Sequence, residues 1–198
     1  MTKLLTIAAI LLAVGALAGL VALFVSRRWA KALLAGGGTP IKPVPAKALR
    51  GFVDDKAAFV VTATQTFAAP RERVWAALDT NGLFSWLPLI NGMRYRDENR
   101  GVGTTRIFDG LLVAGEEQVI AREEGHRLAL TATKSSVPFV MKSITEEYEL
   151  DGNGSGDTTL TWTLAVQPRF GALLPLQLFV PLARPVARWS LRGLSTRI

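Results

Sequence analysis

The sequence predicts an α+β fold in which a curved antiparallel sheet carries two short helices and a long C-terminal helix, preceded by one transmembrane helix. Three observations support this prediction. Runs rich in β-branched and aromatic residues recur between residues 60 and 166, and polar or glycine-rich turns separate them, which is typical of consecutive antiparallel strands. Apolar residues dominate a final segment with helical spacing. An uncharged apolar run opens the chain.

Residues 1–31 are expected to form a membrane anchor with a basic flank. No charged residue occurs from Leu4 to Val25, about the length that a helix needs to cross the ~30 Å hydrocarbon core of a bilayer. The alternative is a cleaved signal peptide, because Ala16-Leu17-Ala18 could serve as a cleavage site. The apolar run exceeds the ~7–15 residues usual for such peptides, which favours an uncleaved anchor.

Basic residues follow the apolar run directly and are expected to lie at the membrane surface: Arg27, Arg28 and Lys31. More basic residues follow the run than precede it. The positive-inside rule therefore predicts a single-pass protein of the cell membrane with a cytoplasmic C-terminal domain.

Residues 32–56 are predicted to form a linker. Gly36-Gly37-Gly38 favours flexibility, and three prolines then favour extended backbone: Pro40, Pro43 and Pro45. The segment is expected to space the domain from the bilayer.

The domain is predicted to begin with a strand and two short helices. The run from Val60 is rich in β-branched residues, and Pro70 suits the first turn of a helix, where its missing N–H costs nothing. That helix shows an apolar face through Val74, Ala77 and Leu78. A second short helix is expected to carry Phe84 and Trp86 before Pro88 ends it.

This stretch also carries a family resemblance. Ala68-Ala69-Pro70, Val74-Trp75 and then Trp86-x-Pro88 resemble the opening of the SRPBCC, or START-like, superfamily, in its polyketide cyclase/dehydrase and lipid transport branch. The resemblance covers residues 57–198. It implies a helix-grip fold, in which the terminal helix closes an apolar cavity over the curved sheet.

The terminal helix is expected within Phe170 to Arg197. Three prolines occur there, so the helix should start after one of them or kink at them: Pro175, Pro181 and Pro185. Arginines recur every four residues on one stripe: Arg184, Arg188 and Arg192. This stripe is expected to face anionic lipid headgroups, the alternative being a merely solvated helix end.

Alternation along the strands indicates which polar residues face inward. From Thr158 to Val166 the apolar and threonine positions alternate, which predicts a sheet covered on one side. The same parity turns Arg106, Glu117 and Glu146 toward the apolar face. A buried carboxylate would have a raised pKa, and an inward arginine could neutralise Glu117 or hold an anionic ligand. The alternative is that a register slip exposes each of them.

Large side chains are the other candidates for the cavity wall. They are Trp75, Trp86, Phe139, Met141, Trp162 and Trp189. The alternative for each is ordinary core packing.

Composition excludes several classes of chemistry. The chain has no cysteine and one histidine, so disulfides, thiolate catalysis and multi-histidine metal sites are excluded. No Gly-x-Ser-x-Gly motif occurs, and the one histidine lies in a turn, which argues against a Ser-His-Asp triad. No nucleotide-binding motif is present, and no catalytic residue, metal or cofactor is assigned. The net charge of +7 favours anionic partners. Arginines that alternate with aliphatic residues argue against nucleic acid as that partner.

Three functions remain open from the sequence. The first is binding or transfer of a hydrophobic small molecule, expected to be a lipid, in an apolar cavity at the membrane surface. The second is a cyclase or dehydratase type of enzyme that uses a cavity carboxylate such as Glu146. The third is a membrane-anchored scaffold without a ligand.

Overall fold

The computed structural model describes residues 2–152, 156–169 and 176–198, with the backbone alone for residues 2–13 and 176–177. In the described residues one antiparallel sheet has the strand order β2-β8-β7-β6-β5-β4-β3, and β1 pairs with β6. The strands are β1 (Thr39–Pro40), β2 (Phe59–Phe67), β3 (Ile90–Tyr95), β4 (Thr105–Gly110), β5 (Ala114–Glu123), β6 (Arg127–Ser135), β7 (Met141–Gly152) and β8 (Thr158–Pro168). The predicted antiparallel strands are thus confirmed.

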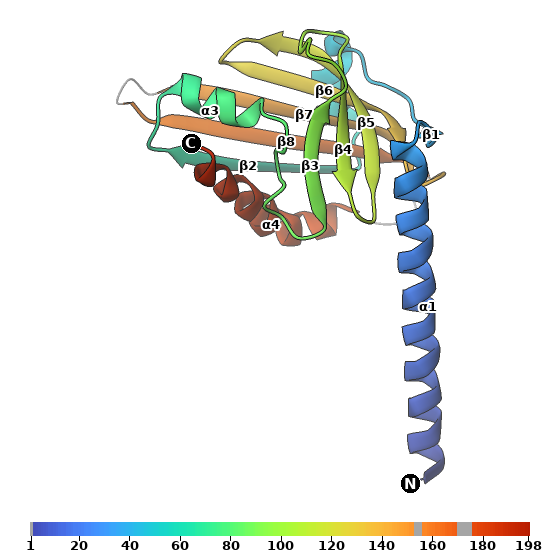
Figure 1. The fold of residues 1–198 in the computed structure, drawn as a ribbon. Coiled ribbons are helices and arrows are strands. Elements are labelled where there is room, and N and C mark those ends of the chain that lie inside the picture. Colours follow the sequence, from blue (N-terminus) through green and yellow to red (C-terminus); the bar gives the residue numbers. More distant parts are fainter. Residues whose placement is uncertain (1, 153–155, 170–175) are drawn as a thin grey trace.

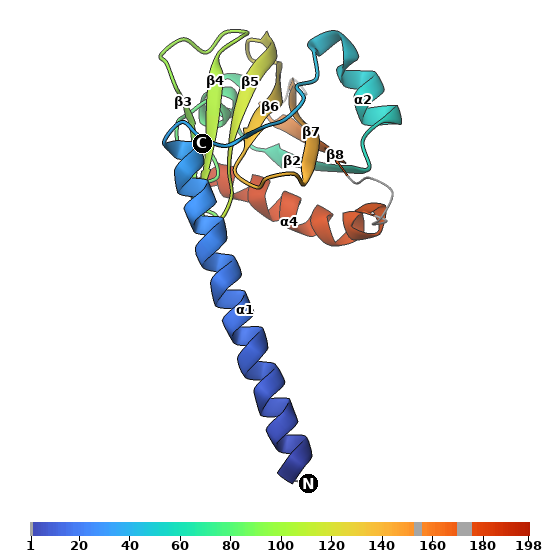
Figure 2. The same cartoon turned by 90° about the vertical axis from the view of Figure 1, so that its right-hand side faces the viewer.

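The helices lie on both faces of the sheet and beside it (Figure 1, Figure 2). They are α1 (Thr2–Leu34), α2 (Leu49–Asp55), α3 (Arg71–Leu78) and α4 (Val180–Arg192). The α3 and α4 helices lie over the inner face, where one apolar cluster joins α4 residues such as Leu191 to strand residues such as Leu128 and Leu160. This arrangement confirms the α+β sheet with a C-terminal helix.

The C-terminal helix is shorter than the predicted segment. It begins at Val180, so Pro181 falls in its first turn, where an N–H is not needed, and Pro185 lies inside it. Short 3-10 turns extend it at Leu176–Phe179 and Gly193–Thr196. Residues 170–175, which include Pro175 and the start of the predicted segment, lie outside the described residues.

The predicted second short helix is wrong. Phe84 and Leu89 both have φ 65°, which no right-handed helix accommodates. The backbone pairs with β3 instead. The N–H of Gly82 donates to the carbonyl of Met93, and the N–H of Met93 donates to the carbonyl of Leu83. Residues 82–89 therefore form a turn that packs Phe84 into the core.

The predicted flexible linker at residues 32–56 is also wrong. The N–H of Ile41 donates to the carbonyl of Thr133 at 3.0 Å, and the N–H of Val44 donates to Thr131 Oγ1 at 2.8 Å. Val44 and Phe52 are buried against Ala165 on the outer face of the sheet. The segment packs there because this part of the outer face carries small apolar side chains such as Ala165, and α2 and the chain before it cover them.

The outer face stays wet only toward its other end. There β2 and β8 pair threonines, and the hydroxyl oxygens lie 3.1 Å apart for Thr62 and Thr163 and 3.0 Å apart for Thr66 and Thr159. The prediction of one covered face therefore holds for this part of the sheet and fails near Ala165.

The long helix α1 leaves the domain as a rod (Figure 1, Figure 2). Only its last turns pack on the sheet, where Ala30 and Leu33 are buried against Ala114. The side chains of α1 are described from Val14 onward. Among the residues whose side chains are described, no helix is both long enough and apolar enough to cross a bilayer. The structure therefore does not support the predicted membrane anchor.

Trp86 fixes the turn at residues 82–89 to the terminal helix. Its indole Nε1 donates to the carbonyl of Ser190 at 2.9 Å, and the ring occupies the space where a side chain at Gly193 would begin. The backbone of Gly193 is ordinary, with φ −62°, so only the ring requires a glycine there.

Gly193→Ala should therefore destabilise the fold by about 1–3 kcal/mol, the usual cost of forcing a side chain into packed space. Equilibrium unfolding in urea measures the change. The matched control is Gly152→Ala, since none of the described residues lies within 4 Å of the methyl group that this change adds. Equal effects of the two substitutions would contradict the steric role of Trp86.

Candidate functional site

A buried ionic cluster lies on the inner face of the sheet. Arg106 on β4 is paired in register with Glu117 on β5, and its guanidinium Nε and Nη2 lie 3.3 Å and 3.2 Å from Glu117 Oε2. Arg106 Nη2 also lies 3.3 Å from Glu146 Oε2 on β7. The exposed fractions are 1% for Arg106, 6% for Glu117 and 8% for Glu146. The inward parity predicted for all three is confirmed.

Tyr148 completes this cluster and was not among the predicted site residues. Its hydroxyl donates to Glu146 Oε2 at 2.7 Å, and Arg106 Cζ lies 5.6 Å from the centre of its ring. The signal was present in the sequence, because Tyr148 shares the parity of Glu146 on the same strand. We call Arg106, Glu117, Glu146 and Tyr148 the inner-face cluster.

Burial and like charge favour the protonated form of Glu146. Burial, together with the neighbouring Glu117, raises the pKa of Glu146 to about 8 against the opposing effects of Arg106 and the Tyr148 hydroxyl. Burial is the largest single effect on Arg106 and tends to lower its pKa, but the charges of Glu117, Tyr148 and Glu146 together outweigh it and the pKa is raised. A protonated Glu146 avoids placing a second negative charge beside the single guanidinium of Arg106.

An unpartnered donor lies beside the cluster. Trp162 on β8 is opposite Tyr148, and the two rings stack with centroids 6.0 Å apart. Its Nε1 is buried and, among the described residues, has no hydrogen-bond partner. A buried N–H without an acceptor costs free energy, so the position suits a polar atom of a bound molecule.

The elements that carry these groups explain their convergence. The four strands β4, β5, β7 and β8 each turn alternate residues to the inner face, and the curve of the sheet brings those residues together (Figure 1). The phenyl ring of Phe84, held by the turn at residues 82–89, lies 5.2 Å from the ring of Trp162. The polar groups thus have an aromatic and aliphatic surround.

Trp75 takes part in a different cluster. Its Nε1 donates to Glu124 Oε1 at 2.7 Å, and Arg122 Cζ lies 5.0 Å from the centre of its ring. Arg122 also donates to both carboxylate oxygens of Asp79, at 3.0 Å and 2.8 Å. Burial raises the pKa of Asp79, but hydrogen bonds from Arg122, Tyr95 and Arg100 outweigh it and the pKa is lowered. These contacts attach α3 to β5 and are structural.

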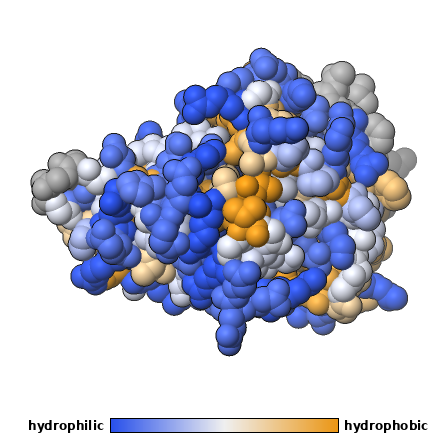
Figure 3. All heavy atoms as spheres, turned by 90° about the horizontal axis from the view of Figure 1, so that it is seen from above, coloured by the Kyte–Doolittle hydropathy of each residue, from blue (hydrophilic) through white to orange (hydrophobic). Residues whose placement is uncertain are grey.

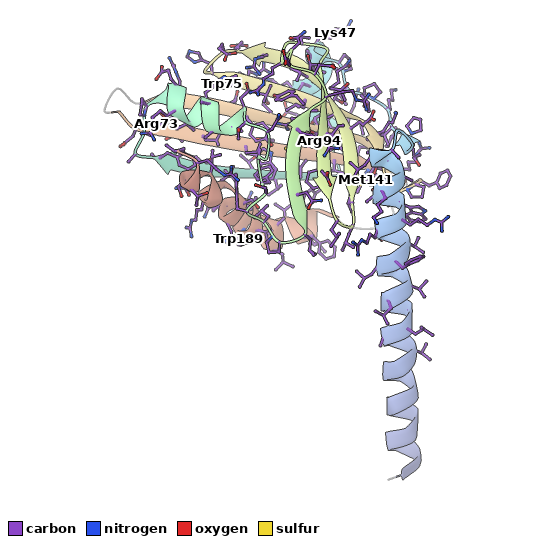
Figure 4. The ribbon with its side chains drawn as sticks, viewed as in Figure 1. Lys47, Arg73, Trp75, Arg94, Met141 and Trp189 are labelled. Atoms are coloured by element: carbon purple, nitrogen blue, oxygen red, sulfur yellow. The ribbon has the colours of Figure 1, made fainter. Side chains whose placement is uncertain are left out.

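Two of the predicted cavity residues lie outside the core. The exposed fractions are 66% for Phe139 and 51% for Trp189. Phe139 precedes β7 with φ 62°, so strand parity does not apply to it. Trp189 lies on the side of α4 turned away from the sheet, because Ala187 and Leu191 take the inward positions (Figure 4).

The remaining candidates are distributed as follows. Met141 is half-buried at the start of β7, away from the inner-face cluster, and Trp86 is half-buried against α4. The candidates for the membrane surface are all exposed: Arg27, Arg28, Lys31, Arg184, Arg188 and Arg192.

Surface hollows occur elsewhere on the domain. One of about 460 Å³ lies where the segment before α2 crosses the sheet and is lined by Val44, Phe52 and lysines such as Lys142. Another of about 340 Å³ lies between α3 and the C-terminus. Neither of these two hollows is lined by residues of the inner-face cluster. The low exposure of the four cluster residues makes the cluster a polar site inside the apolar core.

Glu146→Gln should remove a pH dependence of stability. The pKa of Glu146 is about 8 in the folded protein, well above its usual value of 4.5, so the folded state holds more protons between these pH values. The free energy of unfolding then falls as the pH rises through this window, by at most about 1.4 kcal/mol per pH unit.

Urea unfolding of the wild type and the variant across this pH range measures the difference. Glu149→Gln, at an exposed position of the same strand, is the matched control and should leave the slope in place. A constant difference between the wild type and Glu146→Gln at all pH values would contradict a protonated Glu146.

Known structures share the fold of this chain. TTHA0849 from Thermus thermophilus is 21% identical with a TM-score of 0.55, over 70% of this chain and 96% of that one. A protein from Nitrosospira multiformis is 21% identical with a TM-score of 0.53, over 70% and 94%. The di-domain ARO/CYC BexL of the BE-7585A biosynthetic pathway is 17% identical with a TM-score of 0.50, over 75% and 52%. At these identities the likeness shows the fold alone.

The sequence comparison assigns the family. No curated protein matches the chain. The family described as "Polyketide cyclase / dehydrase and lipid transport" matches residues 58–198, which is most of the chain and the whole of the sheet except β1. The chain therefore belongs to the polyketide cyclase/dehydrase and lipid transport family of the SRPBCC, or START-like, superfamily.

Proposed function

We propose that this protein binds a hydrophobic small molecule whose polar group is received by the inner-face cluster. The observation that carries the proposal is the buried Nε1 of Trp162, which has no hydrogen-bond partner among the described residues and lies beside a cluster that holds the buried carboxyl group of Glu146. The family and its fold support hydrophobic ligand binding in general.

The chemistry of the cluster defines the class of ligand. A protonated Glu146 and the Nε1 of Trp162 can each donate a hydrogen bond to an acceptor on a ligand. Arg106, which contacts Glu146, adds a fixed positive charge. The rings of Tyr148, Trp162 and Phe84 surround these groups with apolar surface. A largely apolar molecule with one carbonyl, hydroxyl or carboxyl group matches this combination, and a lipid is one such molecule.

Access to the cluster requires movement. Arg106 and Tyr148 are almost completely buried, whereas Trp162 keeps part of its ring exposed. A ligand therefore enters beside Trp162, and α4 or the turn at residues 82–89 moves to admit it. The hydrogen bond from Trp86 to Ser190 couples these two elements, so they move together.

Proton transfer to the ligand is a second candidate function. A carboxylic acid whose pKa is about 8 is suited to act as a general acid or base near neutral pH. The description of the matched family names cyclases and dehydrases, and a similar structure bears the label ARO/CYC. In this case Glu146 would deliver or abstract the proton, and ligand binding would be the first step of the reaction.

Membrane location is the third part of the proposal and rests on the sequence. The uncharged run from Leu4 to Val25 and the basic residues after it are typical of a single-pass anchor with the domain in the cytoplasm. Lipid transfer between membranes would follow from a lipid ligand at such a location.

Ligand binding is tested by native mass spectrometry of the full chain released from gentle detergent, followed by organic extraction. The wild type should carry an apolar molecule, and Trp162→Phe should bind it about 5- to 150-fold more weakly and retain less of it, since losing a buried hydrogen bond costs about 1–3 kcal/mol. The matched control is Trp189→Phe, at an exposed tryptophan, which should retain the ligand. A wild type with no bound molecule would contradict the proposal.

The same extraction separates binding from catalysis. A ligand that is recovered unchanged from both the wild type and Glu146→Gln supports binding alone. A ligand that is chemically altered by the wild type and unaltered by Glu146→Gln supports proton transfer.

Membrane location is tested by fractionation of cells that express the full chain. The protein should remain in the membrane fraction after a carbonate wash, and a variant with Leu12→Arg and Val21→Arg should leave it, because each central arginine costs about 2.5–3.5 kcal/mol. Release of the wild-type chain by the wash would refute a spanning anchor.

A further inference from the structure

The side of α4 that faces away from the sheet is apolar and exposed. The exposed fractions are 71% for Leu178, 52% for Phe179, 70% for Leu182, 58% for Val186 and 51% for Trp189. Leu182, Val186 and Trp189 are spaced by four and three residues, so they lie on one stripe of the helix. We call these five residues the outer apolar stripe.

The helix is thus apolar on two sides. Ala187, Leu191 and Leu194 pack on the sheet, whereas no part of the chain that the structure describes removes the outer apolar stripe from water. Single exposed apolar residues are ordinary, but a continuous stripe of large ones is typical of a surface that meets a partner.

The charges beside the stripe indicate the chemistry of the partner. Arg184, Arg188 and Arg192 are exposed on the same helix, and no acidic residue follows Asp157 in the sequence. A positive helix with large apolar side chains and a tryptophan is suited to the boundary between anionic headgroups and acyl chains. A second copy of the chain fits less well, because a two-fold contact would place the same arginines face to face.

The position of the stripe in the fold agrees with a lipid surface. Both ribbon views show α4 as the layer on the side toward which α1 projects (Figure 1, Figure 2). The opposite side of the domain is largely hydrophilic (Figure 3), and Lys47 lies on that side while Trp189 lies on the side of α4 (Figure 4). A bilayer that holds the far part of α1 would therefore meet α4 first.

We infer that α4 and the turn before it dock on an anionic lipid surface, with the outer apolar stripe in the headgroup region and the three arginines on lipid phosphates. The inference is independent of the ligand and uses the proposed membrane location. The docking would orient the domain on the membrane. The helix α4, which covers the inner-face cluster, would then lie against the lipid from which an apolar molecule could enter.

Site-directed spin labelling of the full chain in vesicles tests the inference. Because the chain has no cysteine, Leu182→Cys and the control Lys47→Cys each give one labelled site. Both positions are exposed, so neither substitution should disturb the fold. The vesicles are phosphatidylcholine alone or phosphatidylcholine with phosphatidylglycerol, and the measurement is collision with oxygen and with a water-soluble nickel chelate.

The label at residue 182 should be shielded from the nickel chelate and open to oxygen on the anionic vesicles, and the label at residue 47 should stay open to the chelate on both. Arg184→Gln, Arg188→Gln and Arg192→Gln together should weaken docking roughly 100-fold, at a factor of about five per arginine, whereas the matching lysine variants should preserve it.

Several outcomes would overturn the inference, even where fractionation still finds the chain in the membrane. Equal chelate access at residues 182 and 47 on anionic vesicles would show that α4 stays in water. Equal shielding on both kinds of vesicle would remove the role of the arginines. Shielding that comes with spin–spin broadening and disappears on dilution with unlabelled protein would assign the stripe to a second copy of the chain.

Discussion

The inner face of the sheet depends on the buried guanidinium of Arg106. Glu117 on β5 and Glu146 on β7 both contact this guanidinium in the interior. Burying two negatively charged carboxylates side by side would cost free energy through desolvation and mutual repulsion. Arg106 lies between them, with 1% of its surface exposed, and neutralises one of the two. The other keeps its proton. Without the guanidinium, an uncompensated carboxylate would remain buried, which costs about 3–5 kcal/mol in comparable cases.

The same electrostatic balance makes the site chemically specific. A fully apolar core would accept any apolar molecule of suitable size, whereas this core presents a proton on Glu146 and an unused N–H on Trp162. Buried polar groups that lack partners discriminate strongly, since a molecule that cannot satisfy them leaves them unpaired. These groups are the basis of the proposed ligand class, a molecule with one polar group and a large apolar remainder.

The terminal helix links the interior of the domain with its surroundings. Its inner side packs on the sheet, and its outer side presents apolar and basic residues. Trp86 holds it to the turn at residues 82–89, and that turn also supplies the Phe84 ring beside Trp162. A displacement of α4 would therefore move the Phe84 ring relative to Trp162. Through these contacts, the outer surface of α4 is mechanically connected to the proposed ligand site.

The strands, the terminal helix and the inward direction of three polar residues could be predicted from the amino-acid sequence alone. These residues are Arg106, Glu117 and Glu146. These features depend on alternation and on local turn chemistry, which a single strand already contains. The exact contacts among those three side chains could not be predicted, because strand curvature and pairing register set the distances between different strands.

Which segments cover each face of the sheet could not be predicted, because it depends on contacts between parts of the chain that are distant in sequence. The glycine- and proline-rich segment at residues 32–56 is composed like a spacer, yet it packs over Ala165 because that part of the outer face is apolar. Likewise Phe84 leaves helical geometry to reach the core, and Trp189 points away from the sheet because the inward positions of α4 go to smaller or better-fitting residues. Local pattern identifies an apolar residue, but its burial depends on which other surface it meets, and that surface comes from a distant part of the chain.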